Sequence, residues 1–196
     1  DIGGGTTDIT IYSEGSIVHT AVLALGGNHL THDIAIGLGT PLQEAEEIKH
    51  SNGIALSDMT DENEMIAVPS VGGRNNRQMK KMVLAGIIED RFREIFELIG
   101  REIEKTHYHK LMASGVVITG GSCIMPGVDQ LAHQVLNMPV RVGFPEHISG
   151  LKELIYSPKY ATSVGLVRYG ITSNQGKLNF VGDETNLFHK VSRRMK

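Results

Sequence analysis

Apolar and polar residues alternate over residues 8–25, on either side of a short turn. The two arms, residues 8–12 and 17–23, are rich in β-branched residues, and Ser-Glu-Gly-Ser at residues 13–16 separates them. Alternation with a period of two around a turn that contains glycine is typical of a β-hairpin. We therefore predict an antiparallel hairpin over this segment.

Two helices are predicted after the hairpin. Apolar residues recur every four positions over residues 30–38, which predicts a helix capped by Asn28 and ended by Gly39. Thr-Pro-Leu-Gln at residues 40–43 has the pattern of a capping box and predicts a second helix as far as about Lys49. The two helices are expected to meet at a single glycine.

The middle of the chain changes from polar and irregular to strongly periodic. Residues 50–78 are rich in Ser, Asn, Asp and Gly, with short β-like stretches at 54–56 and 65–68. From Met82 to Ile103 apolar residues form one stripe with charged residues between them, which predicts the longest helix. We expect a small irregular subdomain followed by a long amphipathic helix.

The last third of the chain predicts an α/β arrangement. The apolar run at residues 116–118 is typical of a buried strand, and a helix is predicted over 128–136 and a further strand over 138–142. A last helix is expected from Ser157, and the chain becomes polar and without pattern after Gly170, as in a linker.

Composition narrows the class of protein. The 196 residues include 40% hydrophobic and 21% charged residues, which is ordinary for a globular protein. A net charge of −3 argues against a general nucleic-acid binder, and a single cysteine excludes a disulfide framework. Because the chain opens on a dense motif instead of a strand that would lead into it, we expect the N-terminal part of a longer protein to be missing.

The opening motif, residues 1–8 (Asp-Ile-Gly-Gly-Gly-Thr-Thr-Asp), suits anion binding. Glycines allow backbone N–H groups to point inward as an anion nest, and threonine hydroxyls add donors. A carboxylate at Asp1 is suited to holding Mg²⁺ through water. The same pattern also suits a tight glycine turn between strands. The candidate phosphate and metal residues are Asp1, Gly3, Gly4, Gly5, Thr6 and Thr7.

Two further segments carry candidate chemistry. Gly120 and Gly121 follow a predicted buried strand and precede a helix, which is where nucleotides lie in open α/β sheets. Their spacing fits neither the dinucleotide fingerprint nor the Walker loop. Glu46 and Lys49 lie one helical turn apart and can face one ligand, although the same spacing suits a surface salt bridge.

Taken together, these three segments resemble the second lobe of the actin-like, sugar-kinase and heat-shock-70 ATPase superfamily. Residues 1–8 resemble its second phosphate loop, residues 117–121 its adenosine motif, and residues 45–49 its nucleoside-contacting helix. Within the superfamily, the sequence is most similar to the bacterial cell-division family FtsA over about residues 1–170. Segments that carry this closer similarity include Val-Pro-Ser-Val-Gly-Gly-Arg at 68–74 and Tyr-Ala-Thr-Ser-Val-Gly-Leu at 160–166.

The resemblance implies the following architecture. The fold would be an α/β, actin-like (ribonuclease H-like) second lobe, with a mixed sheet, flanking helices and a small α+β subdomain. Residues 1–39 and 88–170 would form subdomain IIA. Residues 40–87 would form the smaller subdomain IIB, which carries part of the nucleoside and partner sites, and residues 171–196 a linker and the start of a tail.

The resemblance also implies a function. Members of the family bind ATP with Mg²⁺, self-assemble into filaments, hold the FtsZ ring at the cytoplasmic face of the inner membrane at midcell, and recruit later division proteins. Gly3, Gly4, Gly5 and Thr6 would contact phosphates, with Asp1 near the metal. Gly120 and Gly121 would pack on the adenosine, and Glu46 and Lys49 would lie near the ribose or base. Arg77, Arg91 and Glu94 are the candidates for contact with the FtsZ C-terminal tail.

The end of the chain predicts a membrane-binding segment. Apolar and basic residues share a short helical pattern there that is typical of a basic amphipathic membrane helix. Its length favours only weak binding by this chain. The candidate membrane residues are Leu187, Phe188, Lys190, Val191, Arg193, Arg194 and Met195.

Two alternatives share the predicted fold. One is a small-molecule kinase of the same superfamily, which would keep its base and substrate pocket in the first lobe, and the other is a pilus or rod-shape actin homologue. The first lobe of FtsA has no counterpart in this sequence. We therefore expect the chain alone to bind ATP poorly and to lack hydrolytic activity, with at most a weak ATPase in the full-length protein.

Overall fold

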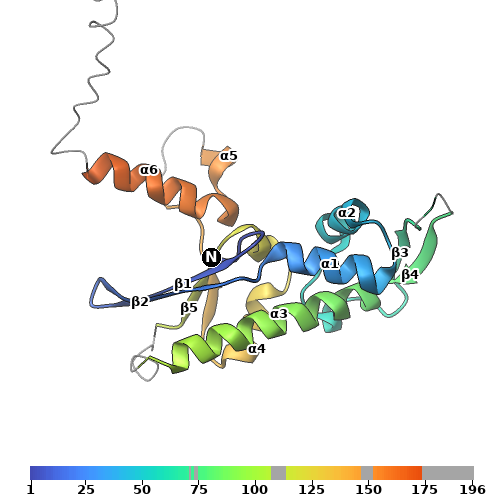
Figure 1. The fold of residues 1–196 in the computed structure, drawn as a ribbon, viewed down its shortest axis with the longest axis horizontal. Helices are drawn as coiled ribbons and strands as arrows, with labels where there is room; N and C mark the ends of the chain where they lie inside the picture. The colour runs from blue at the N-terminus through green and yellow to red at the C-terminus, as the bar shows by residue number, and fades with distance from the viewer. Residues whose placement is uncertain (71, 73–74, 107–113, 147–151, 174–196) are drawn as a thin grey trace, which may run out of the picture. The chain divides into compact units, whose positions relative to one another are not determined.

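The computed structural model describes residues 1–70, 72, 75–106, 114–146 and 152–173 (Figure 1). The chain divides into two compact units, residues 1–162 and 163–196. All elements except most of the last helix belong to the first unit, which also contains the core and the candidate site.

The predicted hairpin is confirmed. Strands β1 (Thr7–Ser13) and β2 (Ser16–Leu23) pair antiparallel, with Ile9 opposite Ala21. The turn between them places Glu14 and Gly15 at φ values of 51° and 78°. Two consecutive positive φ values match the right-handed twist of a hairpin, which explains the glycine.

The two predicted helices are α1 (Gly27–Leu38) and α2 (Leu42–Asn52). Their predicted caps are wrong. Gly26, and not Asn28, caps α1, and its N–H donates to His29 Nδ1. Helix α2 has no side-chain cap, because the Thr40 hydroxyl donates to the Pro69 carbonyl instead.

The polar middle segment contains a short 3₁₀ turn, η1 (Ser57–Met59), and an antiparallel pair of strands, β3 (Met65–Val68) and β4 (Arg77–Lys80). Strand β3 was predicted and β4 was not. The β-like stretch at residues 54–56 is not a strand. Its side chains are buried, and the backbone N–H of Ala55 donates to the Pro126 carbonyl instead of to a neighbouring strand.

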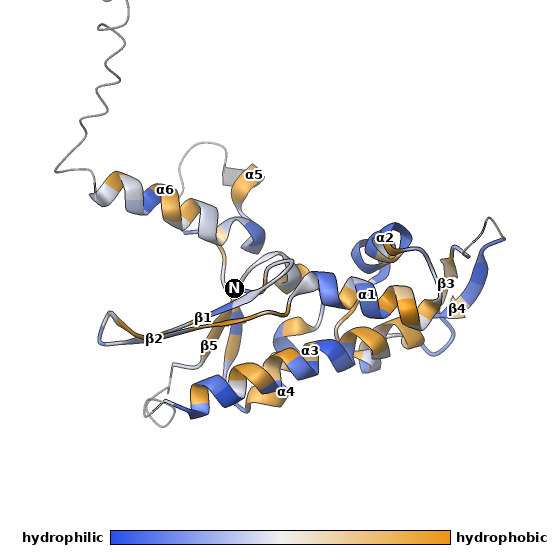
Figure 2. Ribbon diagram, in the orientation of Figure 1, coloured by the Kyte–Doolittle hydropathy of each residue, from blue (hydrophilic) through white to orange (hydrophobic). Residues whose placement is uncertain are grey.

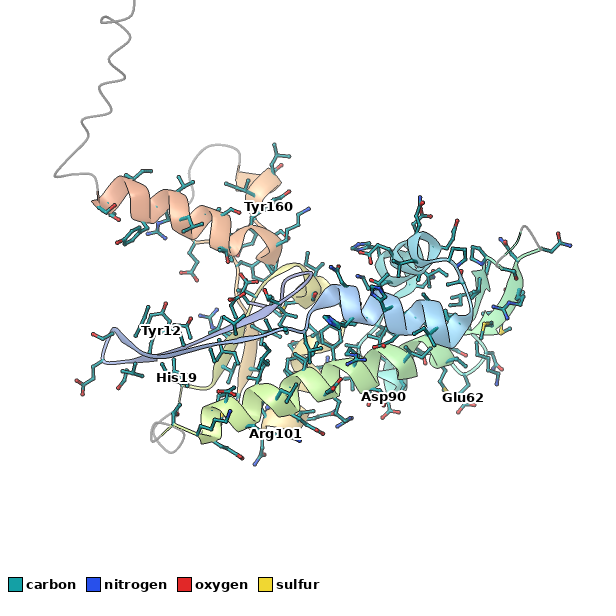
Figure 3. The ribbon with its side chains drawn as sticks, viewed as in Figure 1. Tyr12, His19, Glu62, Asp90, Arg101 and Tyr160 are labelled. Carbon is teal, nitrogen blue, oxygen red and sulfur yellow. The ribbon has the colours of Figure 1, made fainter. Side chains whose placement is uncertain are left out.

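The long amphipathic helix is α3 (Lys81–Glu104), and its buried stripe is the centre of the core. Phe92 and Phe96 are fully buried and stack with ring centroids 5.9 Å apart. Figure 2 shows apolar and polar residues alternating along this helix. Asp90 and Arg101 are exposed residues of the helix (Figure 3). Helix α3 packs against both α1 and α4.

A parallel pair of strands follows, β5 (Val116–Ile118) and β6 (Val140–Val142), with a 3₁₀ turn, η3 (Gly121–Ile124), and helix α4 (Val128–Leu136) between them. All of these except η3 were predicted. The chain continues through α5 (Lys152–Ile155), η4 (Pro158–Tyr160) and α6 (Ala161–Ser173). Helix α6 thus extends past residue 170 into the segment predicted as a linker.

Ile2 joins the hairpin to the parallel pair. It forms an antiparallel bridge with Thr7, and its N–H donates to the Thr119 carbonyl over 2.8 Å. Beyond this link, residues of β1 and β5 line one cavity of about 980 Å³. Helices flank the strands, which confirms the predicted α/β class. The predicted mixed sheet is not observed among the described residues, because the parallel and antiparallel pairs belong to separate two-stranded sheets.

Candidate functional site

The opening glycine motif forms a tight exposed loop ahead of β1. The Gly3 N–H donates to the Thr6 carbonyl over 2.9 Å, which closes the turn. Gly4, Gly5 and Thr6 are exposed, and the Thr6 hydroxyl donates to the Asp8 carboxylate over 3.2 Å. A loop of this kind has backbone N–H groups available to an anion.

The start of α1 docks on this loop. Gly27 N–H donates to the Gly3 carbonyl over 2.9 Å, and Asn28 N–H donates to the Gly4 carbonyl over 2.7 Å. A Cβ on Gly26 would lie 2.6 Å from the Gly3 oxygen, so this approach requires glycine. The N-terminus of α1 therefore lies against the predicted phosphate loop, where a helix favours negative charge.

The second glycine loop meets the first from the other side. The Ser122 N–H and hydroxyl donate to the carbonyls of Ile2 and Gly3, each over 3.2 Å. Gly120 has φ 97°, and a Cβ there would lie 2.4 Å from Asp1 Oδ1. Only glycine fits this position, because the backbone conformation and the close contact both exclude a side chain.

The two loops and helix α2 line one cleft of about 340 Å³. This volume lies within the range of small-molecule sites. Five of the predicted nucleotide residues line it: Gly3, Gly4, Glu46, Lys49 and Gly121. Other lining residues were not predicted from the sequence, among them Gly27, Asn28, Ser122, Met125 and Pro126. The adjacent glycines at 26 and 27 are the one signal in the sequence for this close approach.

Glu46 and Lys49 form the predicted pair, with 2.7 Å between Oε2 and Nζ. Burial by itself would raise the pKa of Glu46, but hydrogen bonds from Lys49 and Thr31 and the nearby charges of Lys49 and His50 outweigh it, so the pKa lies below its usual value. Glu46 is therefore a carboxylate at neutral pH, while the Lys49 side chain is 9% exposed.

The other predicted nucleotide residues lie beside this cleft and do not line it. Asp1 accepts a hydrogen bond from the Thr162 hydroxyl. Thr7 is buried, and its hydroxyl donates to the Leu25 carbonyl over 2.8 Å, so it holds the segment that follows β2. Gly5, Thr6 and Gly120 belong to the loops that form the cleft but lie outside its lining.

The three predicted partner residues make contacts within the chain. Arg91 of α3 pairs with Asp33 of α1 and with Glu94. The hydrogen bond to Asp33 and the nearby carboxylates raise the pKa of Arg91, with burial acting against them. Arg77 donates to the carbonyls of Leu38 and Gly39 at the end of α1.

The predicted membrane residues of the tail, Leu187, Phe188, Lys190, Val191, Arg193, Arg194 and Met195, lie outside the described residues. Among the residues that the structure does describe, no helix combines the length and apolar character that crossing a bilayer requires.

Solved structures with a similar fold define the class. MreB5 of Spiroplasma citri bound to ADP superposes with a TM-score of 0.69 at 20% identity, over 91% of this chain and 54% of that protein. A chain of the PilM–PilN type IV pilus biogenesis complex gives 0.62 at 19% identity, over 87% of this chain and 44% of that one. The chain is thus an actin-like α/β protein with a cleft between two glycine loops.

Sequence comparison identifies the family within that class. The family model for "Cell division protein FtsA" matches residues 1–165, and the chain belongs to this family. The cell division protein FtsA of Pseudomonas aeruginosa is 45% identical over 171 residues, which cover 87% of this chain and 41% of that protein. The chain therefore spans less than half the length of this relative.

Proposed function

We propose that this chain supplies one wall of an adenine-nucleotide site in a bacterial cell-division protein of the FtsA type. The observation that carries the proposal is the convergence of Gly3-Gly4, Gly121-Ser122 and the Glu46–Lys49 pair on one cleft. Backbone N–H groups of the exposed glycine loop at one end suit phosphates, and the Glu46 carboxylate at the other, which Lys49 holds in place, can accept hydrogen bonds from the hydroxyl groups of a nucleoside.

Glycines let the backbone segments around the cleft approach one another closely. A Cβ on Gly27 would lie 2.7 Å from Ser122 Oγ, and a Cβ on Gly26 would lie 2.9 Å from the Gly4 carbonyl. The chain therefore has glycine, without a side chain, at the two positions where its backbone approaches the glycine loops. Asp1 offers a carboxylate, the oxygen ligand that Mg²⁺ favours, and the Thr162 hydroxyl orients it. When bound, the metal would neutralise phosphate charge.

The whole protein would use this site as an assembly switch. The full FtsA-type protein would self-assemble, bind the FtsZ C-terminal tail, recruit later division proteins, and lie at the septum on the cytoplasmic face of the inner membrane through its basic tail. Arg77 supports the partner site because it contacts the end of α1, the helix that carries the 81% exposed Ile36. Exposed apolar positions beside a cation suit an acidic, partly apolar peptide.

An NMR titration of ¹⁵N-labelled chain with ATP and Mg²⁺ tests the nucleotide site, because this method detects weak binding. We expect saturable shifts at the amides of Gly3, Gly4 and Gly121. Gly121→Glu adds a negative charge inside the cleft and should abolish them. Gly86→Glu adds the same charge on α3, where no atom lies within 4 Å of the added Cβ, and should retain them. Shifts confined to other regions would refute the proposed site.

Fluorescence anisotropy with a labelled FtsZ C-terminal peptide tests the partner site. Arg77→Glu should weaken saturable binding, while Arg101→Glu, which reverses the same charge elsewhere on the surface, should leave it unchanged. Circular dichroism would confirm that both variants are folded. Equal binding by both variants would remove Arg77 from the proposed partner site.

Co-sedimentation with anionic vesicles tests the tail. The chain ending at residue 173 should bind less than the full chain, and binding of the full chain should fall as salt rises, since basic residues near a charged leaflet contribute about 1 kcal/mol each. Equal sedimentation of both chains would count against membrane binding through residues 187–195.

A further inference from the structure

The hydroxyl of Thr31 lies at a buried junction between α1 and α2. The residue is 4% exposed. Its oxygen accepts a hydrogen bond from Lys49 Nζ over 2.7 Å, and it lies within hydrogen-bond distance of Glu46 Oε2 and, at 3.1 Å, of the Gly27 carbonyl. The single hydroxyl proton goes to one of these two acceptors, while the oxygen remains the partner of Lys49.

Lys49 uses all of its donors within the chain. An ammonium group has three N–H bonds, and those of Lys49 point to the Gly27 carbonyl at 3.1 Å, Thr31 Oγ1 at 2.7 Å and Glu46 Oε2 at 2.7 Å. The Lys49 side chain is 9% exposed, and its three hydrogen bonds fix the position of the ammonium group. Lys49 therefore acts as a clamp between α2 and the start of α1.

Gly27 connects this clamp to the phosphate loop. Its carbonyl accepts from Lys49, while its N–H and that of Asn28 donate to the carbonyls of Gly3 and Gly4. A displacement of the first turn of α1 therefore moves the donors that hold the loop. The chain of contacts runs without a gap from Glu46 through Lys49 and Thr31 to Gly27 and Gly3.

Thr31 does not belong to the lining of the cleft, so any effect of this residue on a ligand is indirect. We propose that Thr31 is a positioning residue, which fixes Lys49 and the start of α1 so that the loop at Gly3-Gly4 keeps the conformation that binds the phosphates of a nucleotide. The ligand part of this inference rests on the proposed function. The part that concerns the start of α1 does not.

Amide hydrogen exchange of the chain without nucleotide tests the structural part. Thr31→Val keeps the shape of the side chain but removes the acceptor for Lys49, and a buried donor left without a partner is costly. We expect exchange at Gly27 and Asn28 to accelerate by about tenfold or more. Thr31→Ser should restore wild-type exchange, because it keeps the hydroxyl.

Thr60→Val is the matched control. The Thr60 hydroxyl also donates to a backbone carbonyl, that of Ser57, away from the cleft. This variant should leave exchange at Gly27 and Asn28 unchanged. If Thr31→Val does not fold, Glu46→Gln weakens the same junction at a partly exposed side chain, and its exchange at Gly27 and Asn28 should rise as well. Unchanged exchange in the folded variant would overturn the inference.

A comparison of ATP with adenosine tests the ligand part. A positioning role for the phosphate loop predicts that Thr31→Val weakens ATP binding by about tenfold and adenosine binding by a smaller factor, because ATP loses its phosphate contacts in addition to any change at the nucleoside end of the cleft. Equal weakening of both ligands would indicate a structural effect alone and would overturn this part. If the wild-type chain binds neither ligand, the proposed function fails, while the exchange experiment still decides whether Thr31 holds the start of α1.

Discussion

Arg91 of α3 holds Asp33 of α1 through two parallel hydrogen bonds, Nε to Oδ2 at 2.5 Å and Nη2 to Oδ1 at 3.0 Å. Both side chains are about three-quarters buried, with 23% and 27% exposed. A two-point contact of this kind fixes geometry more strongly than an ordinary surface ion pair. Arg91 therefore contributes to the packing of α1 on α3, whatever partner it also contacts.

Arg91→Glu should destabilise the chain. It places a third carboxylate beside Asp33 and Glu94 and removes their shared donor, so we expect the free energy of unfolding to fall by about 1–3 kcal/mol. Urea denaturation would measure the change, with Arg101→Glu, whose side chain is 66% exposed, as the control. A peptide-binding loss in Arg91→Glu is interpretable only after this measurement. Equal stability of the two variants would show that the contacts of Arg91 with Asp33 and Glu94 contribute little to the stability of the fold.

Glu89 should be equally important for attaching the polar middle segment. It accepts hydrogen bonds from the N–H and hydroxyl of Ser57 and from Arg93, and its side chain is 17% exposed. Burial alone would raise the pKa of Glu89, but these donors lower it overall. Glu89→Ala leaves the Ser57 donors unpaired, and a loss of about 1–3 kcal/mol in thermal or urea unfolding is expected.

The control for Glu89 is Glu97→Ala, which removes an exposed carboxylate from the same helix. This variant should change the free energy of unfolding by less than about 0.5 kcal/mol. Comparable effects of the two substitutions would show that the contacts of Glu89 with Ser57 contribute little.

Periodicity along the sequence predicted the elements whose stability depends on burial of one face. The apolar stripe of α3 and the short apolar run of β5 were both predicted, because each pattern is formed by residues that are close together in the sequence. The cap of α1 could not be predicted in this way. Gly26 takes that place because the backbone of Gly27 docks on the Gly3 carbonyl, a contact between segments far apart in the sequence.

The candidate site was also predicted only in part, because some of its contacts join segments that are far apart in the sequence. The spacing of Glu46 and Lys49 predicted their pairing, but the burial of Lys49 depends on Thr31 and Gly27 from another helix. Thr7 was grouped with the phosphate loop because of its residue type. Its hydroxyl instead bonds to the Leu25 carbonyl, a partner that only the pairing of β1 with β2 brings close. The types of residue in these segments indicated where the site lies, but only the tertiary contacts show what each residue does there.

Two glycine substitutions should have opposite effects. Gly120→Ala forces a side chain onto Asp1 and Ile2 at a φ of 97°, and should lower the melting temperature and disturb the second glycine loop. Gly86→Ala lies within α3 with no atom within 4 Å of the new Cβ, and should raise stability by about 0.5–1 kcal/mol. Differential scanning calorimetry measures both. A stable Gly120→Ala variant would show that the loop tolerates rearrangement.

Cys123 should be unreactive in the folded chain. Burial raises the pKa of its thiol to about 12, and Sγ lies 2.9 Å from the Thr119 carbonyl. The thiolate is the reactive form, so alkylation near pH 8 should proceed only when the second glycine loop opens. Labelling with iodoacetamide under native conditions should be far slower than in urea. Fast native labelling would contradict this burial, whereas protection by added nucleotide would link the loop to the ligand.

Glu46 should make stability depend on pH in acid. Its folded pKa lies below the usual value, so the folded state favours the carboxylate, and the resulting stabilisation is present above about pH 4.5. It is lost as pH falls through the lowered folded pKa, because both states are then protonated. The difference in free energy of unfolding between wild type and Glu46→Gln should therefore shrink as the pH falls below about 4.5. Glu47→Gln removes an exposed carboxylate from the same helix and serves as the control. A difference that stays constant over this range would mean that the bonds from Lys49 and Thr31 do not favour the charged form of Glu46.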